Sequence, residues 1–143
     1  MFVKTNTKTN TAADPLPRDG TVSYTLPIDD LTTNLTRGTL DLLILKALSW
    51  GPRHGYGVAD WIEQATGETL LVGEGTLYPA LHRLERHRLV LAEWGLSESN
   101  RHAKFYRLSA AGRQRLQAGT STWERFVEAA GRALRATAPV PAT

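Results

Sequence analysis

The sequence predicts a mainly α-helical fold with one two-stranded β-hairpin, and three observations support this prediction. Apolar residues recur at helical spacing in three consecutive segments between residues 36 and 87. Two strand-like runs follow, at 89–94 and 103–108, on either side of a polar turn. A last helical segment carries apolar residues at near-heptad spacing. The order helix, helix, helix, two-stranded wing, helix is that of a winged helix-turn-helix with a C-terminal helix added.

The composition excludes several classes of protein. The chain has 143 residues, 41% of them hydrophobic, which suits one domain with tails. It contains no cysteine, so disulfides, thiolate metal sites and thiol catalysis are excluded. No run approaches the ~18 apolar residues of a membrane span, and the first residues lack an apolar leader. We therefore expect a cytoplasmic protein.

The chain divides into four parts. Residues 1–33 are rich in Thr, Asn, Asp and Pro and show no apolar period, which predicts a flexible N-terminal arm. Residues 34–108 form the predicted winged helix-turn-helix domain. Residues 109–135 form the C-terminal helix, and residues 136–143 are expected to be a disordered tail.

The first predicted helix, residues 36–49, is apolar nearly all round. Thr36 is its expected N-cap, and from Leu40 to Leu48 only Asp41 and Lys46 are charged. Such a helix needs cover on two sides, and a second subunit is the expected second cover. The next helix, residues 56–65, has a single apolar stripe and ends at Gly67.

The third helix, residues 76–87, has two contrasting faces. We expect Thr76 to cap it, which would put Pro79 in the first turn. One face is predicted to be buried and carries Leu77, Leu81 and Leu84. The opposite face carries hydrogen-bonding and cationic side chains, namely Tyr78, His82, Arg83 and Arg86.

Positive charge is concentrated in and after the wing. No acidic residue lies between Asn100 and Arg115, whereas five basic ones do: Arg101, Lys104, Arg107, Arg113 and Arg115. Such a cluster is typical of a phosphate-binding face. On charge alone, an ordinary solvated surface explains it equally well.

The combination of helix and wing predicts binding to duplex DNA. The major groove, ~12 Å wide, admits one helix, whose N-terminal half reaches the base edges. Here that half carries Thr76, Tyr78, His82 and Arg83. Arg83 has the donors to pair with a guanine, and we expect Arg101 and Lys104 to contact phosphates.

The last helix, with Ser109 as its expected cap and a potential interruption at Gly119, is predicted to form a dimer interface. Its near-heptad spacing is typical of a helix packed along another helix. The residues expected in this interface, together with Leu43 from the first helix, are Leu116, Trp123, Phe126, Val127, Ala130 and Leu134.

Simpler interpretations compete at several positions. A tyrosine such as Tyr78, taken alone, is more often a half-buried helix residue than a DNA contact. The four histidines lack the spacing of a zinc site, so neither a metal nor a cofactor is expected. His54-Gly55-Tyr56-Gly57 is better explained by a tight turn than by a phosphate cradle. No nucleophile and base can be paired, which argues against an enzyme.

Four runs carry a resemblance to a known family: LTRGTLDLLILKALSWGPRHGYGVADWI, GEGTLYPALHRLERHRLV, EWGLSESNRHAKFYRLSAAGRQRL and the tail that contains Trp123. Across about Leu35 to Leu134 they resemble the PadR family of bacterial transcriptional regulators. This resemblance implies a winged-helix dimer held by its C-terminal helix, and usually repression relieved by a small molecule or stress signal. It also implies that Tyr78 and Lys104 lie near DNA. The N-terminal arm departs from the family pattern.

The sequence therefore predicts a dimeric, sequence-specific regulator of transcription that binds an inverted-repeat operator in double-stranded DNA. We expect a repressor, with a small aromatic effector bound at the dimer interface beside Trp123. The alternative is a winged-helix protein-interaction module that does not bind DNA.

Overall fold

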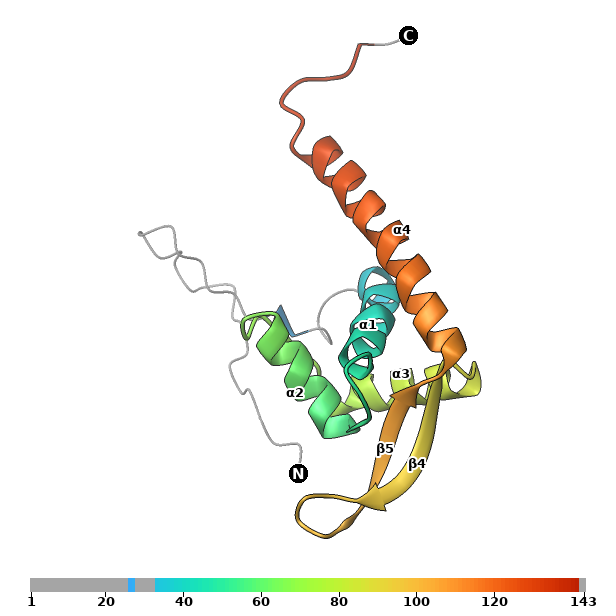
Figure 1. The fold of residues 1–143 in the computed structure, drawn as a ribbon. Helices are drawn as coiled ribbons and strands as arrows, with labels where there is room; N and C mark the ends of the chain where they lie inside the picture. The colour runs from blue at the N-terminus through green and yellow to red at the C-terminus, as the bar shows by residue number, and fades with distance from the viewer. Residues whose placement is uncertain (1–25, 28–32, 142–143) are drawn as a thin grey trace, which may run out of the picture.

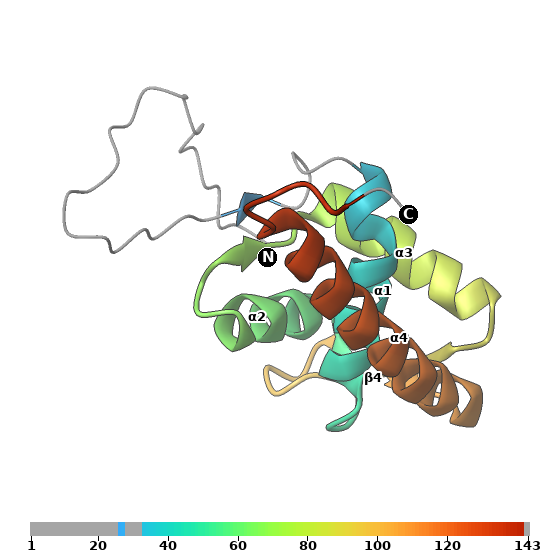
Figure 2. The same ribbon diagram turned by 90° about the horizontal axis from the view of Figure 1, so that it is seen from above.

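The computed structural model describes residues 26–27 and 33–141, with side chains from residue 38 onward. Three helices, α1 (Thr33–Leu48), α2 (Gly55–Ala65) and α3 (Glu74–Arg86), pack together above the hairpin of β4 (Val90–Leu96) and β5 (His102–Leu108). The long helix α4 (Ala110–Leu134) crosses α1 and extends beyond it (Figures 1 and 2). Most of the predicted arm lies outside the described residues. Within it, β1 (Leu26–Pro27) pairs in parallel with β3 (Leu70–Leu71).

The first two helices begin earlier than predicted. Helix α1 begins at Thr33, so the prediction that Thr36 caps it is wrong. Helix α2 begins at Gly55 and is capped by His54, whose Nδ1 accepts a hydrogen bond of 3.0 Å from the N–H of Gly57. An imidazole in this position occupies a first-turn N–H that would otherwise lack an intrahelical partner.

Helix α3 also begins earlier, at Glu74, with Gly73 at the N-cap, so the prediction that Thr76 caps it is wrong. The extended Gly73 backbone lets its carbonyl accept from the N–H groups of Thr76 and Leu77. Pro79 is consequently the sixth residue of the helix and not part of its first turn. Because proline has no N–H, the carbonyl of Gly75 lacks its usual helical partner.

The predicted hairpin is present, with strands at 90–96 and 102–108 in place of the predicted 89–94 and 103–108. It is part of a three-stranded sheet, in which β5 lies between β4 and a further strand. Val90 lies opposite Leu108 and Leu96 opposite His102. The additional strand β2 (Arg53–His54) pairs antiparallel with β5. A two-residue strand has no alternation of its own, so the sequence pattern could not reveal it.

The core lies between the first three helices and the inner face of the sheet. The predicted buried face of α3 is confirmed, since Leu77, Leu81 and Leu84 are all buried. They pack in one cluster with Ile44, Leu45, Leu48, Val58, Ile62, Val90 and Tyr106. This burial fixes which side of α3 faces solvent.

Helix α4 is continuous over 25 residues, so the predicted interruption at Gly119 does not occur. The predicted cap is confirmed: Ser109 Oγ accepts from the N–H of Gly112 and donates to the carbonyl of Arg88. At Gly119 a Cβ would lie 2.5 Å from Cδ2 of Leu42 in α1. The glycine thus allows α4 to approach α1 closely.

Candidate nucleic-acid interface

The exposed side of α3 is a narrow stripe. Glu74 is exposed in the first turn of α3. Gly75, Pro79, His82 and Arg86 are also exposed, at spacings of four, three and four residues. These spacings place them on one helical face, opposite the buried leucines. His82 was among the candidate residues and lies in the stripe. Arg86 was recognised on this face but not among the candidate DNA contacts.

The other candidates on α3 flank the stripe and are half-buried. The ring of Tyr78 packs against the start of α2, where a Cβ on Gly55 would lie 2.9 Å from its hydroxyl oxygen. Burial raises the pKa of Tyr78, and the negative charge of Glu74 and the neighbouring Tyr106 add to this effect. The hydroxyl therefore remains protonated at neutral pH. Thr76, also half-buried, follows Gly75 and lies at the edge of the stripe.

Arg83 has a partner within the subunit. Its Nη2 lies 2.5 Å from the Oδ1 of Asp41 in α1, and the two side chains are 24% and 26% exposed. A guanidinium has five N–H donors, so one ion pair leaves others available. The pair nevertheless directs Arg83 toward α1, away from the centre of the stripe.

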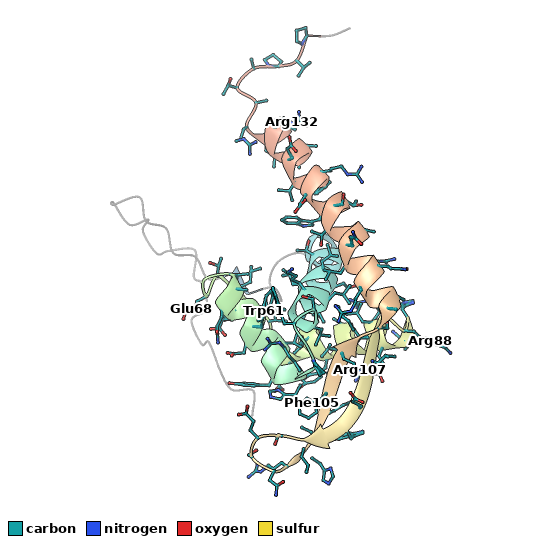
Figure 3. The ribbon with its side chains drawn as sticks, in the orientation of Figure 1. Trp61, Glu68, Arg88, Phe105, Arg107 and Arg132 are labelled. Carbon is teal, nitrogen blue, oxygen red and sulfur yellow. The ribbon has the colours of Figure 1, made fainter. Side chains whose placement is uncertain are left out.

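The wing adjoins α3 through a second ion pair. Lys104 Nζ lies 3.5 Å from the Oε2 of Glu85 in α3 and 5.4 Å from the ring centre of Tyr106. Arg107, labelled in Figure 3, lies on the opposite face of β5. It pairs with Glu93 of β4. Arg101 and His102 are exposed at the tip of the hairpin. The candidate residues Arg101 and Lys104 thus lie on the structural unit that borders α3.

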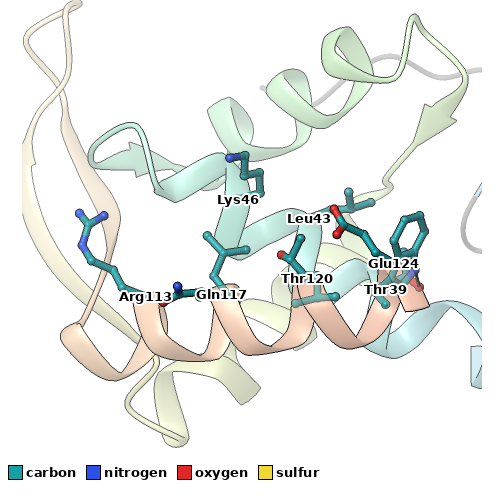
Figure 4. A pocket seen from close by; sticks show the side chains of 10 residues that line it. Thr39, Leu43, Lys46, Arg113, Gln117, Thr120 and Glu124 are labelled. Atoms are coloured by element: carbon teal, nitrogen blue, oxygen red, sulfur yellow. Dashed lines mark hydrogen bonds between the residues drawn. The ribbon is translucent and has the colours of Figure 1, made fainter. Parts of the chain in front are cut away.

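A groove of about 540 Å³ is lined by side chains of α1 and α4 (Figure 4). Its walls combine apolar, polar and charged side chains: Thr39, Leu42, Leu43, Lys46, Arg113, Leu116, Gln117, Thr120, Trp123 and Glu124. Trp123 Nε1 donates a hydrogen bond of 3.3 Å to Thr39 Oγ1 across one end. Of the predicted interface residues, Leu43 and Leu116 are half-buried here and pack against the core.

The remaining predicted interface residues continue the same face of α4 beyond α1. In the first half of α4, Leu116 and Gly119 on this face lie against α1 or the core. In the second half, Phe126 is 63% and Leu134 87% exposed. Val127 is also exposed and Ala130 is half-buried. The apolar face of α4 is thus covered by α1 and the core along its first half and exposed along its second half.

Within residues 26–27 and 33–141, no three His, Asp or Glu side chains are grouped as ligands of a metal ion. None of the helices described is both long and apolar enough to cross a membrane.

Comparison with protein families gives one assignment. The model of the "Transcriptional regulator PadR-like family" matches residues 44–118, which is 75 of the 143 residues. This segment contains the end of α1, all of α2 and α3, the wing and the first turns of α4, and it ends before Thr120, Trp123 and Glu124 of the groove.

Two curated proteins of uncharacterized function are similar to parts of this chain. Protein X of Lysinibacillus sphaericus is 28% identical over 96 residues, which cover 67% of this chain and 88% of the relative. A 37.1 kDa protein in transposon TN4556 of Streptomyces fradiae is 45% identical over 76 residues, or 53% of this chain and 20% of that protein.

Solved structures show the same fold. A transcriptional regulator from Clostridium thermocellum is 27% identical with a TM-score of 0.63, over 69% of this chain and 96% of that one. A PadR-like transcription factor from Bacteroides fragilis is 28% identical with a TM-score of 0.58, over 71% and 95%. The four helices and three-stranded sheet thus match those of winged-helix transcription regulators.

Proposed function

Because this chain belongs to the transcriptional regulator PadR-like family, whose members are DNA-binding regulators, we propose that it is a dimeric repressor that recognises a specific sequence in duplex DNA. One observation carries the proposal: α3 leaves His82 and Arg86 exposed on one face, beside a wing that carries Arg101 and Lys104. An α-helix ~10–12 Å across fits a major groove of similar width.

Within this proposal, the stripe of α3 enters the major groove. His82 and Arg86 point outward and have donors for base edges or phosphates. Tyr78 and Thr76, at the edge of the stripe, contact the DNA backbone, and the protonated Tyr78 hydroxyl donates to a phosphate oxygen. Arg83 remains a candidate reader of guanine, and for this role its guanidinium has to share or leave Asp41.

The wing supplies contacts that do not depend on sequence. Arg101, exposed at the hairpin tip, is placed for a phosphate of the strand beside the groove. Lys104 exchanges Glu85 for a phosphate when DNA binds, and because the Nζ–Oε2 distance of 3.5 Å is long and the pair is partly exposed, little stability is lost in the exchange.

Dimerisation through α4 is the second part of the proposal. The bare apolar face of Phe126, Val127 and Leu134 is covered when a second copy packs along it. A two-fold dimer presents two α3 helices, and a spacing of ~34 to 36 Å between them would match an inverted repeat of one helical turn. A dimer bound across a promoter would block transcription. The proposed place of action is the cytoplasm.

The groove between α1 and α4 is the proposed effector site. Its volume of about 540 Å³ lies within the ~300–1,000 Å³ of small-molecule sites. The indole of Trp123 offers a flat apolar surface, while Lys46 and Glu124 supply charges on the walls. A small aromatic molecule with a polar group fits this combination.

The proposal is tested with the full chain and a random duplex library. We expect retention of duplex DNA at low ionic strength, loss with added salt, and enrichment of an inverted repeat. Light scattering is expected to give the mass of two chains. A monomer that ignores duplex DNA at low ionic strength would refute the proposal and favour the protein-interaction module.

The effector site needs a separate experiment. A panel of aromatic compounds is titrated while tryptophan emission and the melting temperature are followed. We expect at least one compound to change both and to release the duplex. A Trp123→Phe variant that shows the same emission change would remove Trp123 from the site.

A further inference from the structure

We propose that the indole of Trp94, on the wing, is a DNA contact that packs against the deoxyribose of the strand beside α3 and donates its N–H to a phosphate. This inference rests on the proposed function, because it assigns a residue to the same interface. The family match covers Trp94 but gives no role to this residue.

The register of the hairpin places Trp94 on the side of the wing that adjoins α3. Side chains alternate along a strand, so Val90, Ala92, Trp94 and Leu96 share one face. Their partners on β5 on that face are Leu108, Tyr106, Lys104 and His102 in the same order. Val90, Leu108 and Tyr106 are buried in the core. Trp94 therefore continues the core-facing surface of the sheet toward the tip, past the end of the core.

The side chains of this surface near the tip of the wing are exposed although they are apolar. Trp94 is 72% exposed and Leu96 is 61% exposed. Neither is counted among the half-buried residues that pack against the core. Among the described residues, the indole N–H has no hydrogen-bond partner. A large aromatic side chain held out on a rigid hairpin, with both its apolar face and its donor available, is suited to a partner that is itself part apolar and part polar.

The charges around Trp94 select DNA as that partner. Lys104 is directly opposite Trp94 in the hairpin and reaches Glu85 of α3. Arg101 and His102 lie toward the tip, and the exposed Arg86 lies on α3. Of the acidic residues of the wing, Glu93 lies on the other face of the hairpin and pairs with Arg107, and Glu98 is exposed in the turn at the tip. A polyanion with apolar sugar surfaces complements this arrangement.

The test compares Trp94→Ala with Trp50→Ala in the full chain. Trp50 is a matched control because it is 65% exposed and lies outside the wing, against Lys46. Affinity for a fluorescein-labelled mixed-sequence duplex is measured over a range of salt concentrations. We expect Trp94→Ala to weaken binding roughly 10-fold, equivalent to about 1.4 kcal/mol, and Trp50→Ala to have no effect.

The salt dependence identifies the kind of contact. The indole of Trp94 carries no charge and so releases no counterions from DNA. Trp94→Ala should therefore lower affinity by the same factor at every salt concentration. Emission gives a second readout: duplex DNA should change the tryptophan emission of the wild type, and Trp94→Phe should remove most of this change. Since Trp94 is mostly exposed, both variants should fold with the wild-type melting temperature.

Three outcomes would overturn the inference. Wild-type affinity in Trp94→Ala, together with an unaltered emission change in Trp94→Phe, would exclude the contact while leaving the proposed function intact. A change in oligomeric mass in Trp94→Ala, without a loss of DNA binding, would assign the indole to a contact between copies. Failure of the wild type to bind any duplex would reject the proposed function itself, and this inference with it.

Discussion

Arg83 of α3 and Asp41 of α1 form an ion pair across 42 residues of sequence, with Nη2 and Oδ1 2.5 Å apart. The pair joins the helix proposed to enter DNA to the helix that lines the α1–α4 groove through Leu42, Leu43 and Lys46. Helix α1 therefore contacts both the proposed DNA-binding helix and the proposed effector groove. A shift of α1 relative to α3 would change the geometry of both.

The pair should stabilise the fold measurably. In a double-mutant cycle of Asp41→Ala and Arg83→Ala, we expect a coupling energy of about 1 kcal/mol, at the upper end for exposed pairs because both side chains are only a quarter exposed. Urea unfolding of the four proteins measures this coupling. A value indistinguishable from zero would show that the contact does not hold α3 against α1.

The same two variants test whether Arg83 reads a base. If it does, Arg83→Ala relaxes the preference at one base pair of a selected operator, at a cost of about 1–3 kcal/mol, whereas Asp41→Ala leaves the preference intact. Binding selection with each variant measures this. If both variants weaken binding to all sequences equally, Arg83 acts by positioning α3.

Lys104 is expected to act through phosphate. Lys104→Ala should lower affinity to a similar degree on operator and random duplexes, and should reduce the slope of log K against log salt by about 1. Fluorescence anisotropy at several salt concentrations provides the measurement. Arg107→Ala is the control, since Arg107 lies on the opposite face of the wing. A slope that stays at the wild-type value would contradict the phosphate contact.

The apolar face of α4 should be required for dimerisation. Phe126→Glu places a charge in the centre of this face, and we expect light scattering to report a monomer with much weaker operator binding. Ser121→Glu adds the same charge to an exposed position on the same helix, about 140° away at ~100° per residue. It should remain dimeric. A dimeric Phe126→Glu would place the interface elsewhere.

Gly112, at the start of α4, should tolerate no side chain. A Cβ there would lie 2.1 Å from the carbonyl oxygen of Leu89, a backbone atom that cannot turn away. We expect Gly112→Ala to lower the free energy of unfolding by about 1–3 kcal/mol, as overpacking does. Gly38→Ala in α1 meets nothing within 4 Å and should instead raise stability by about 0.5–1 kcal/mol. Equal melting temperatures for the two variants would show that α4 shifts freely at this point.

Stability at high pH should depend on Tyr78. Its pKa is raised in the folded protein by burial first and by Glu74 and Tyr106 next, whereas an unfolded tyrosine ionises at about 10. The unfolded chain therefore loses its proton first as the pH rises, and this favours unfolding. The stability associated with the proton is intact below the unfolded pKa and is lost as the pH rises through the folded pKa. Urea unfolding between neutral and alkaline pH should show a smaller decline in Tyr78→Phe than in the wild type. An identical decline would contradict the shift.

Much of the fold could be predicted because it depends on local periodicity. The buried leucines of α3, the hairpin and the Ser109 cap are each specified by residues within a few positions of one another. The start of α3 was predicted wrongly because Thr76 has a good capping side chain, whereas the cap is set by the extended backbone at Gly73. The interruption at Gly119 was predicted wrongly because the glycine serves a contact with Leu42, in a distant segment.

The sequence by itself determined the order of the elements, the leucine face of α3 and the family, since apolar spacing and contiguous motifs are properties of neighbouring residues. Only the tertiary structure decided which polar side chains on α3 are available. Arg83 and Lys104 have carboxylate partners on other elements, while His82 and Arg86 remain exposed. The physical reason is that the direction and the charge environment of a long side chain depend on the groups packed against it, and here those groups come from distant parts of the chain.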